Sequence, residues 1–290
     1  MTQGSLFADT DLPSPITEFV VQITSNLEGQ DHYASGTGVI VAPFLAFAAR
    51  HVLEEHWHRH HNEPMRLAGE QVGRFSFVLA QLVADGLNLW TVTRLWASGD
   101  TDIVILRLTP YSEGARHYQF RHMTLDVMAP RIGEHVHGFG YADSAITVAG
   151  AKQLSVRQSA KTTHGDVVEV FYDRRDPIRL PFPCFRTNAR FDGGMSGGPI
   201  FNDAGHLCGL ICSTYPPFTP DEDHASYAVL LWPIMGMPID MNRVGRPPGE
   251  RIRVFDLVGE NILMTVNADK LTVGNLPEDG GGASVQLFVP

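Results

Sequence analysis

The stretch FDGGMSGGPIF, residues 191–201, places one serine among four glycines, directly before an apolar pair typical of a strand. A nucleophilic serine needs exposure at a sharp turn, a base for its proton, and backbone N–H groups for the oxyanion. Glycines permit backbone conformations closed to other residues, so the N–H groups of Gly194 and Ser196 can point to one place. Taken alone, a plain glycine-rich turn is the better interpretation of this stretch.

Two earlier segments supply the missing groups. In GTGVIVAPFLAFAARHVL, residues 36–53, His51 follows two apolar runs and is expected at a strand end. In GDTDIVILRL, residues 99–108, Asp102 precedes an almost unbroken apolar run, where a carboxylate is costly unless it is paired. A histidine N–H is one such pairing group. A surface histidine and a turn-capping aspartate are the alternatives when each segment is taken singly.

The order His51, Asp102, Ser196, each in its own local context, resembles that of the trypsin/chymotrypsin-like serine peptidases. The segment AARHV resembles the family's "TAAHC", TDIVILRL resembles "DIALLKL", and GGMSGGPIF resembles "GDSGGPL". RIGEHVHGFGY resembles the first strand of the family's second barrel, and SYAVLLWPIMGM its last strand and closing helix. The resemblance covers about residues 15–242.

The resemblance implies an all-β fold of two six-stranded antiparallel barrels, with few short helices and a small C-terminal β extension. Short β-rich runs separated by turn residues agree with it. We expect an N-terminal extension over 1–14, the first barrel over 15–120, the second over 121–242, and a linker with a small β element over 243–290.

The resemblance also implies the chemistry. Ser196 would attack a peptide carbonyl, His51 would carry the proton, and Asp102 would orient the histidine. The N–H groups of Gly194 and Ser196 would form the oxyanion hole. No cofactor is expected. The partners would be a protein or peptide substrate and, through residues 243–290, a regulatory protein.

Substrate-binding residues are carried over from the same resemblance. Ser213, Thr214 and Tyr215 would line the specificity pocket and pair with the substrate strand. Arg190 stands six residues before Ser196, where trypsins place a pocket-floor aspartate, so a preference for an acidic residue before the cut is one hypothesis. A solvated Arg190 is the alternative.

Two residues depart from the family pattern. Arg50 stands where alanine is usual. Met195 replaces the aspartate that pairs with a new N-terminus in zymogen-forming members, so we expect no activation by N-terminal cleavage. The segment RTNARFDGGMSGGP, together with the lack of a disulfide pattern, is closest in style to bacterial HtrA-like domains. Residues 243–290 are too few for a PDZ domain.

Composition limits the partners and the compartment. A net charge of −10 disfavours a general nucleic-acid binder, and no apolar run is long enough for a membrane span. The N-terminus lacks the features of a secretory signal. Cys184, Cys208 and Cys212 are expected to be buried, unpaired apolar residues, which favours a cytoplasmic location.

Histidines gather in HVLEEHWHRHH, where a short helix is expected. His56, His58, His60 and His61 have spacings compatible with a zinc site, but an exposed segment after the catalytic turn is the favoured interpretation. His135 and His137 share one strand face, for which packing or surface exposure is the default.

Three functions remain open at this point. The leading hypothesis is an active serine endopeptidase, which by analogy with known effectors would be a regulated bacterial cytoplasmic protease for stress or defence. A catalytically silent binding module on the same fold is the second. The third is a self-processing protease whose C-terminus would lie in its own cleft.

Overall fold

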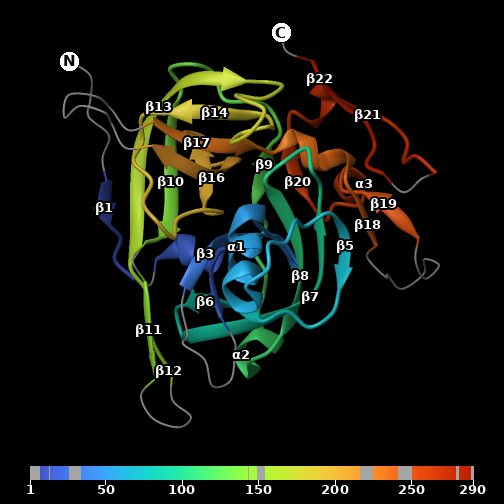
Figure 1. Cartoon of the computed structure of the whole chain (residues 1–290). Helices are drawn as coiled ribbons and strands as arrows, with labels where there is room; N and C mark the ends of the chain where they lie inside the picture. Colours follow the sequence, from blue (N-terminus) through green and yellow to red (C-terminus); the bar gives the residue numbers. More distant parts are fainter. Residues whose placement is uncertain are drawn as a thin grey trace, which may run out of the picture.

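The computed structural model describes residues 7–12, 14–25, 34–142, 144–148, 154–215, 225–240, 250–278 and 281–288. Two β-barrels fill most of this part, one above the other in Figure 1, with helix α1 (Arg50–His61) in front of them. None of the helices in these residues has the length and apolar character needed to cross a membrane.

The first barrel is a closed ring of six antiparallel strands in the order β7-β6-β2-β3-β4-β8, closed by pairing of β7 with β8. Alternate buried and half-buried residues along β7 put every second side chain inside, as a strand with one face on the core requires. β5 (Gly69–Val72) pairs with β7 outside the ring. The ring strands are β2 (Val20–Ser25), β3 (Ala34–Ala42), β4 (Leu45–Ala49), β6 (Phe77–Val83), β7 (Gly86–Ala97) and β8 (Ile103–Pro110).

The second barrel is also a closed antiparallel ring, in the order β10-β13-β14-β17-β16-β15, with β15 paired back to β10. Its ring strands are β10 (His135–Tyr141), β13 (Ala160–Phe171), β14 (Cys184–Thr187), β15 (Pro199–Asn202), β16 (Leu207–Tyr215) and β17 (Ala225–Leu230). The predicted fold class, two six-stranded antiparallel barrels with few helices, is confirmed.

Several short elements lie outside the two rings. β1 (Phe7–Asp9) pairs with β13, and β9 (Thr124–Asp126) pairs in parallel with β16. The others are the hairpin β11 (Ala145–Val148) and β12 (Leu154–Arg157), helix α2 (Glu113–Arg116), and the 3-10 turn η1 (Pro15–Glu18).

The closing helix implied by the resemblance is not formed among the described residues. The segment after β17 makes only a 3-10 turn, η2 (Trp232–Gly236), followed by β18 (Pro238–Asp240). Pro238 explains why no helix continues past this turn, because proline lacks the N–H that continues a helix and clashes with the preceding turn, whereas Pro233 lies in the first turn, where proline is tolerated.

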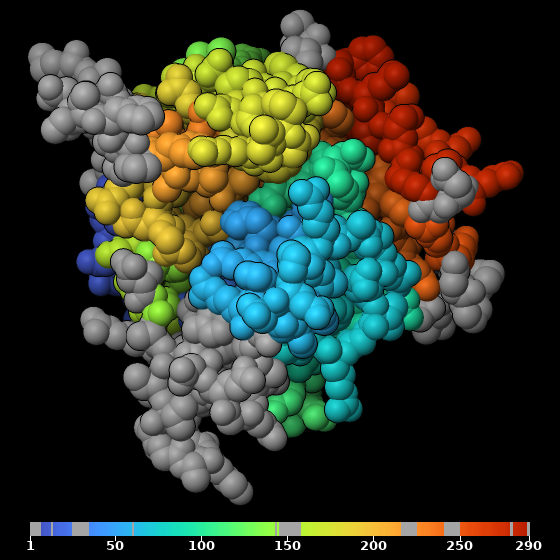
Figure 2. Space-filling view, viewed as in Figure 1, coloured from blue at the N-terminus to red at the C-terminus, as the bar shows by residue number. Residues whose placement is uncertain are grey.

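The C-terminal residues fold back onto the barrels (red in Figure 1) and cover one flank of the molecule (Figure 2). β19 pairs with β18, and β20 pairs with β9 of the main sheet. Leu257, Leu263 and Leu271 are buried in a core cluster that also contains residues of both barrels. The elements are β19 (Arg251–Arg253), α3 (Asp256–Gly259), β20 (Met264–Val266), η3 (Ala268–Lys270), β21 (Leu271–Val273) and β22 (Val285–Leu287). These leucines of the C-terminal segment are therefore part of the hydrophobic core.

Candidate active site

His51 is placed by the junction of β4 and α1. The strand β4 is completely buried, and α1 begins at Arg50, so His51 lies in the first helical turn at the rim of the first barrel. Its ring Nδ1 lies 2.7 Å from Oδ2 of Asp102. The carboxylate accepts from this N–H, so the lone pair of Nε2 is left for a proton. The His51 side chain is 40% exposed, which leaves the ring accessible.

Asp102 lies immediately before β8, the strand paired with β4. Its Oδ1 also accepts the backbone N–H of His51 at 3.1 Å, and its carbonyl oxygen accepts the N–H of Arg50 at 2.6 Å. Asp102 is only 3% exposed, and the backbone and ring N–H groups of His51, which donate to its carboxylate, make burial of the charge tolerable. Together they fix the start of α1 relative to β8.

The pKa of His51 lies above its ordinary value. Desolvation of the ring lowers this pKa, but the charge of Asp102 and the hydrogen bond to it raise it more, with smaller contributions from Glu55 and Glu54. The pair therefore favours the protonated form of His51, the form that a general base reaches after it has taken a proton.

Ser196 lies on the turn between β14 and β15, in the second barrel. Gly194 and Gly197 on either side have φ angles of +90° and +84°, and a Cβ at Gly197 would lie 2.1 Å from the carbonyl oxygen of Thr37. Only glycine fits this close approach in the left-handed region. The turn thus lies against β3 of the first barrel.

The hydroxyl of Ser196 donates to the carbonyl oxygen of Cys212 at 3.3 Å. Among the described residues no hydrogen bond joins this hydroxyl to the ring of His51. The N–H groups of Gly194 and Ser196, by contrast, donate to no other group of the described chain and are available for an oxyanion.

Two residues of the site were missed at the level of sequence. The sequence predicts Cys212 only as a buried apolar residue, whereas its thiol donates to Oδ2 of Asp102 at 3.2 Å. Burial raises the pKa of this thiol well above its ordinary value, and the neighbouring Asp102 raises it further, so Cys212 stays protonated as a donor. All three cysteines are free and buried, as expected.

Thr37 is the other missed residue. It is fully buried in β3, its N–H donates to the carbonyl of Ser196 at 2.9 Å, and its hydroxyl donates to the carbonyl of Gly194 at 2.8 Å. The same hydroxyl accepts the N–H of Tyr141 in β10 at 3.0 Å. A polar residue between two glycines, directly before an apolar run, was the available signal.

The two departures from the family pattern have simple surroundings. Met195 is completely buried in an apolar cluster of the second barrel, and its sulfur accepts the N–H of Asp192 at 3.3 Å. The guanidinium of Arg50 donates to the carbonyl of Ser98 at 2.8 Å and lies 3.6 Å from Glu54. Arg50 therefore closes the outer side of the His51 turn.

The expected substrate-binding residues come from two segments of the second barrel. Ser213, Thr214 and Tyr215 continue β16 directly from Cys212, and the ring of Tyr215 packs against that of Tyr227. Arg190 forms two hydrogen bonds with the carboxylate of Asp192, at 2.9 and 3.0 Å. Its guanidinium also lies 4.5 Å from the ring centre of Phe7 in β1.

The histidines of α1 do not form a metal site in the described part of the chain. His56 is buried, with its ring nitrogens 3.1 Å from the hydroxyls of Ser35 and Ser76. The side chain of His60 lies outside the described residues, and the only member of this helix in the two groups of clustered ligand atoms found in the remainder is His51.

The family model described as "Trypsin-like peptidase domain" matches residues 36–210. The chain belongs to this family. The matched range of this trypsin-like peptidase domain includes His51, Asp102 and Ser196 and ends within β16. None of the curated proteins matches the chain.

Among solved structures, the chain is similar to two structures of Rv3671c. One is the inactive form of a serine-to-alanine mutant from M. tuberculosis H37Rv, with a TM-score of 0.45 and 16% identity, covering 79% of this chain and 91% of that chain. The other is the inactive form of the Rv3671c protease, with a TM-score of 0.42 and 16% identity, covering 74% of this chain and 84% of that chain.

Proposed function

We propose that the protein is a serine endopeptidase that cleaves peptide bonds of protein substrates through His51, Asp102 and Ser196. The observation that carries the proposal is the 2.7 Å hydrogen bond between Nδ1 of His51 and Oδ2 of Asp102. This bond leaves Nε2 of His51 as the base. The turn that carries Ser196 also has two backbone N–H groups, those of Gly194 and Ser196, that donate to no other group of the described chain. Membership of the trypsin-like peptidase family supports the same conclusion.

The reaction divides into two acyl transfers. Oγ of Ser196 attacks the substrate carbonyl carbon while its proton passes to Nε2 of His51, and the N–H groups of Gly194 and Ser196 bind the oxygen that becomes negative. The C–N bond then breaks, and the leaving amine takes the proton from His51. A water molecule, deprotonated by His51, hydrolyses the ester and restores the serine.

Regulation is part of the proposal. The buried Met195 cannot form the ion pair with a new N-terminus that a zymogen needs, so we infer that N-terminal cleavage does not activate the enzyme. The three free, buried cysteines favour a reducing cytoplasm, consistent with a bacterial protease for stress or defence. A regulatory partner would bind the outer surface of residues 243–290, where the large apolar side chains of Met264 and Phe288 are exposed.

A catalytically silent binding module is the second candidate, and one observation favours it. The Ser196 hydroxyl donates to the carbonyl of Cys212. A serine held in this way has to rotate about χ1 before His51 can take its proton. Self-processing, the third hypothesis, predicts a mass change when the pure protein is incubated.

Labelling with a fluorophosphonate probe separates the first two candidates. We expect the wild-type protein to be labelled, and Ser196→Ala and His51→Ala not to be. Ser14→Ala, at a serine before η1 whose side chain makes no capping hydrogen bond, serves as the matched control and should label like the wild type. Absence of labelling in folded wild-type protein contradicts the endopeptidase and leaves the binding module.

A further inference from the structure

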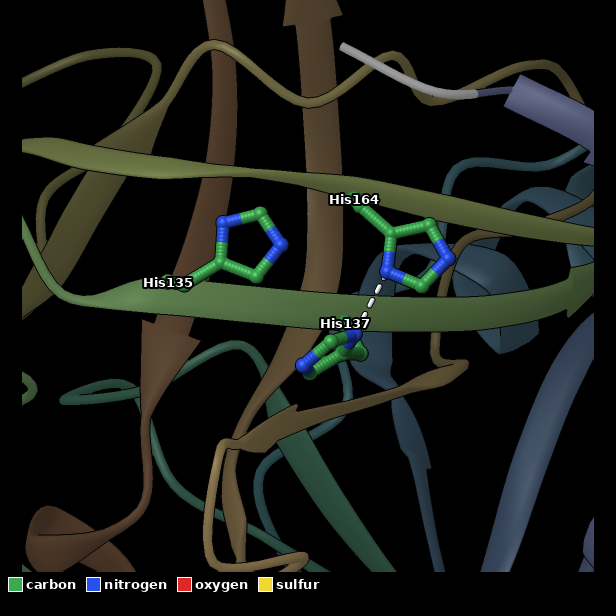
Figure 3. A group of neighbouring side chains, drawn as sticks. All are labelled: His135, His137 and His164. Carbon is green, nitrogen blue, oxygen red and sulfur yellow. Dashed lines mark hydrogen bonds between the residues drawn. The ribbon is translucent and has the colours of Figure 1, made fainter. Parts of the chain in front are cut away.

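Three histidines gather on one face of the second barrel, outside the candidate active site. His135 and His137 lie two residues apart on β10, so both side chains project from the same face. His164 stands directly opposite His137 in the antiparallel register of β13. One nitrogen from each of the three rings lies within 4.8 Å of the other two. Figure 3 shows the rings converging from the two neighbouring strands.

In two of the rings, the nitrogen that faces away from the cluster, here called the outer nitrogen, is hydrogen-bonded to a carboxylate. Nδ1 of His135 lies 2.9 Å from Oδ1 of Asp166, and Nε2 of His137 lies 3.0 Å from Oδ1 of Asp203. An ionised carboxylate only accepts hydrogen bonds, so each of these nitrogens carries the proton. In the neutral rings the lone pairs are then on Nε2 of His135 and Nδ1 of His137.

The inner nitrogens face one another. Nδ1 of His137 lies 2.5 Å from Nδ1 of His164, and the dashed line in Figure 3 joins these two atoms. Nε2 of His135 points toward the same space in Figure 3. Because Nδ1 of His137 has the lone pair, Nδ1 of His164 is the donor in the contact between these two atoms, and His164 offers a third lone pair here once its proton is on Nε2 instead. Three imidazole lone pairs directed at one point make a set of ligands for a borderline divalent metal.

We propose that His135, His137 and His164 bind one zinc ion through these inner nitrogens, with water as the fourth ligand. Asp166 and Asp203 orient two of the ligands by accepting their outer N–H groups, an arrangement that fixes the histidine tautomer and raises its basicity. The side chains of His135 and His137 are 39% and 35% exposed, which leaves a path for the ion and room for the water.

Only a small adjustment of the rings is needed. Zinc–nitrogen bonds of about 2.0 Å in a tetrahedron place two ligand nitrogens about 3.3 Å apart. Rotation of the half-exposed His137 and His164 rings has to open their 2.5 Å contact to that distance. The backbone positions of the three residues are already set by the pairing of β10 with β13.

A second group of ligand atoms in the described part of the chain, His51, Asp102 and Cys212, carries no such proposal. It belongs to the candidate active site, where Nδ1 of His51 and the thiol of Cys212 are both occupied as donors to Asp102. The histidine cluster on β10 and β13 has no role in the proposed reaction, so metal binding there is separable from proteolysis.

Zinc titration of the full-length, chelator-treated protein tests the proposal. A chromophoric zinc chelator reports the free ion by competition, and Co²⁺ replaces Zn²⁺ to report tetrahedral geometry by absorption. We expect one ion per chain. His137→Gln and His164→Gln should each weaken the affinity at least about 100-fold, while Asp203→Asn should weaken it about 10- to 100-fold.

Two controls place the ion. His206→Gln changes a histidine beside Asp203 that is outside the cluster, and His51→Ala removes a ligand of the catalytic group; both should bind zinc like the wild type. Circular dichroism checks that each variant is folded, and Asp203→Asn, a change of a turn residue, provides the result if a ligand variant does not fold.

Either of two results overturns the proposal. One is wild-type protein that binds no zinc with a dissociation constant below about 10 µM, a weak affinity for a three-histidine site. The other is tight binding that His137→Gln, His164→Gln and Asp203→Asn leave unchanged, which would place the ion elsewhere. Neither result depends on whether the protein hydrolyses peptides.

Discussion

The thiol of Cys212 donates a hydrogen bond to the carboxylate of Asp102 across the interface between the two barrels, with the sulfur 3.2 Å from Oδ2. Asp102 thus has donors from His51 on one barrel and from Cys212 on the other. The backbone carbonyl of the same Cys212 accepts the Ser196 hydroxyl. One residue of β16 therefore contacts both the acid and the nucleophile of the proposed triad.

Removal of the thiol should weaken the support of Asp102. We expect Cys212→Ala to lower kcat/KM about tenfold, because one hydrogen bond to a buried charge is lost. Cys212→Ser replaces the thiol by a hydroxyl donor and should keep most of the activity. The matched control is Cys208→Ala, at a cysteine whose thiol donates to the carbonyl of Ile200 away from the site. Equal losses in all three variants would contradict the role of the thiol.

The pH dependence of hydrolysis should follow His51. The pKa of His51 is raised, and its neutral form is the base, so kcat/KM should be high above that pKa and fall as the pH decreases through it. The inflection should lie above 6.5, the ordinary value for histidine. Asp102→Asn should lower kcat on the order of 10⁴-fold, because the wrong tautomer of His51 is then favoured. An inflection below 6.5 would argue against this pairing.

Thr37 should control the position of the serine turn. Thr37→Val keeps the shape but leaves the carbonyl of Gly194 and the N–H of Tyr141 without the hydroxyl, at a cost of about 1–3 kcal/mol in the free energy of unfolding. We also expect a fall in kcat. Thr24→Val, in the first barrel, removes a bond to the carbonyl of Val78 and should reduce stability only. Denaturant unfolding and steady-state kinetics measure both effects.

Met195 should not tolerate the aspartate of zymogen-forming relatives. Met195→Asp puts a charge at a position with no exposed surface, inside an apolar cluster, so several kcal/mol of unfolding free energy should be lost. Met195→Leu, of similar volume, should cost less than about 1.5 kcal/mol. A stable Met195→Asp protein with normal activity would show that a cationic partner reaches this position.

Substrate preference should depend on the Arg190–Asp192 pair. If Arg190 selects an acidic residue before the cut, it has to do so in competition with Asp192, which already accepts two of its hydrogen bonds. Asp192→Asn should therefore increase the preference for acidic peptides in a library, and Arg190→Ala should abolish it. Identical cleavage profiles for wild type, Asp192→Asn and Arg190→Ala would exclude Arg190 as a selector.

The local patterns of the sequence predicted the elements that carry the proposed triad. The apolar run before His51 forms β4, the run after Asp102 forms β8, and the PIFN segment after the glycines forms β15. Each prediction depended on periodicity or on turn chemistry, which act over a few residues. The small β element expected within residues 243–290 was less clear from the sequence, because in its first part only Arg251–Arg253 forms a strand and Asp256–Gly259 forms a short helix.

Those local patterns did not predict the contacts between distant segments. Thr37 and Cys212 are ordinary small residues in strands, and their partners, Ser196 and Asp102, are more than a hundred positions away. The zinc-ligand proposal has the same origin, since His164 meets His137 only through the register of β10 and β13. A one-residue shift of that register would turn His164 to the other face.

By itself the sequence determined the succession of strands along the chain, the glycine turn around Ser196 and the family, because each depends on residue types at short spacing. The tertiary structure alone decided which donors hold Asp102, where the Ser196 hydroxyl points, and which histidines converge on one face. The physical reason is that hydrogen bonds and metal ligation require positions accurate to a few tenths of an ångström, and only the packed pairing of strands from distant parts of the chain sets them.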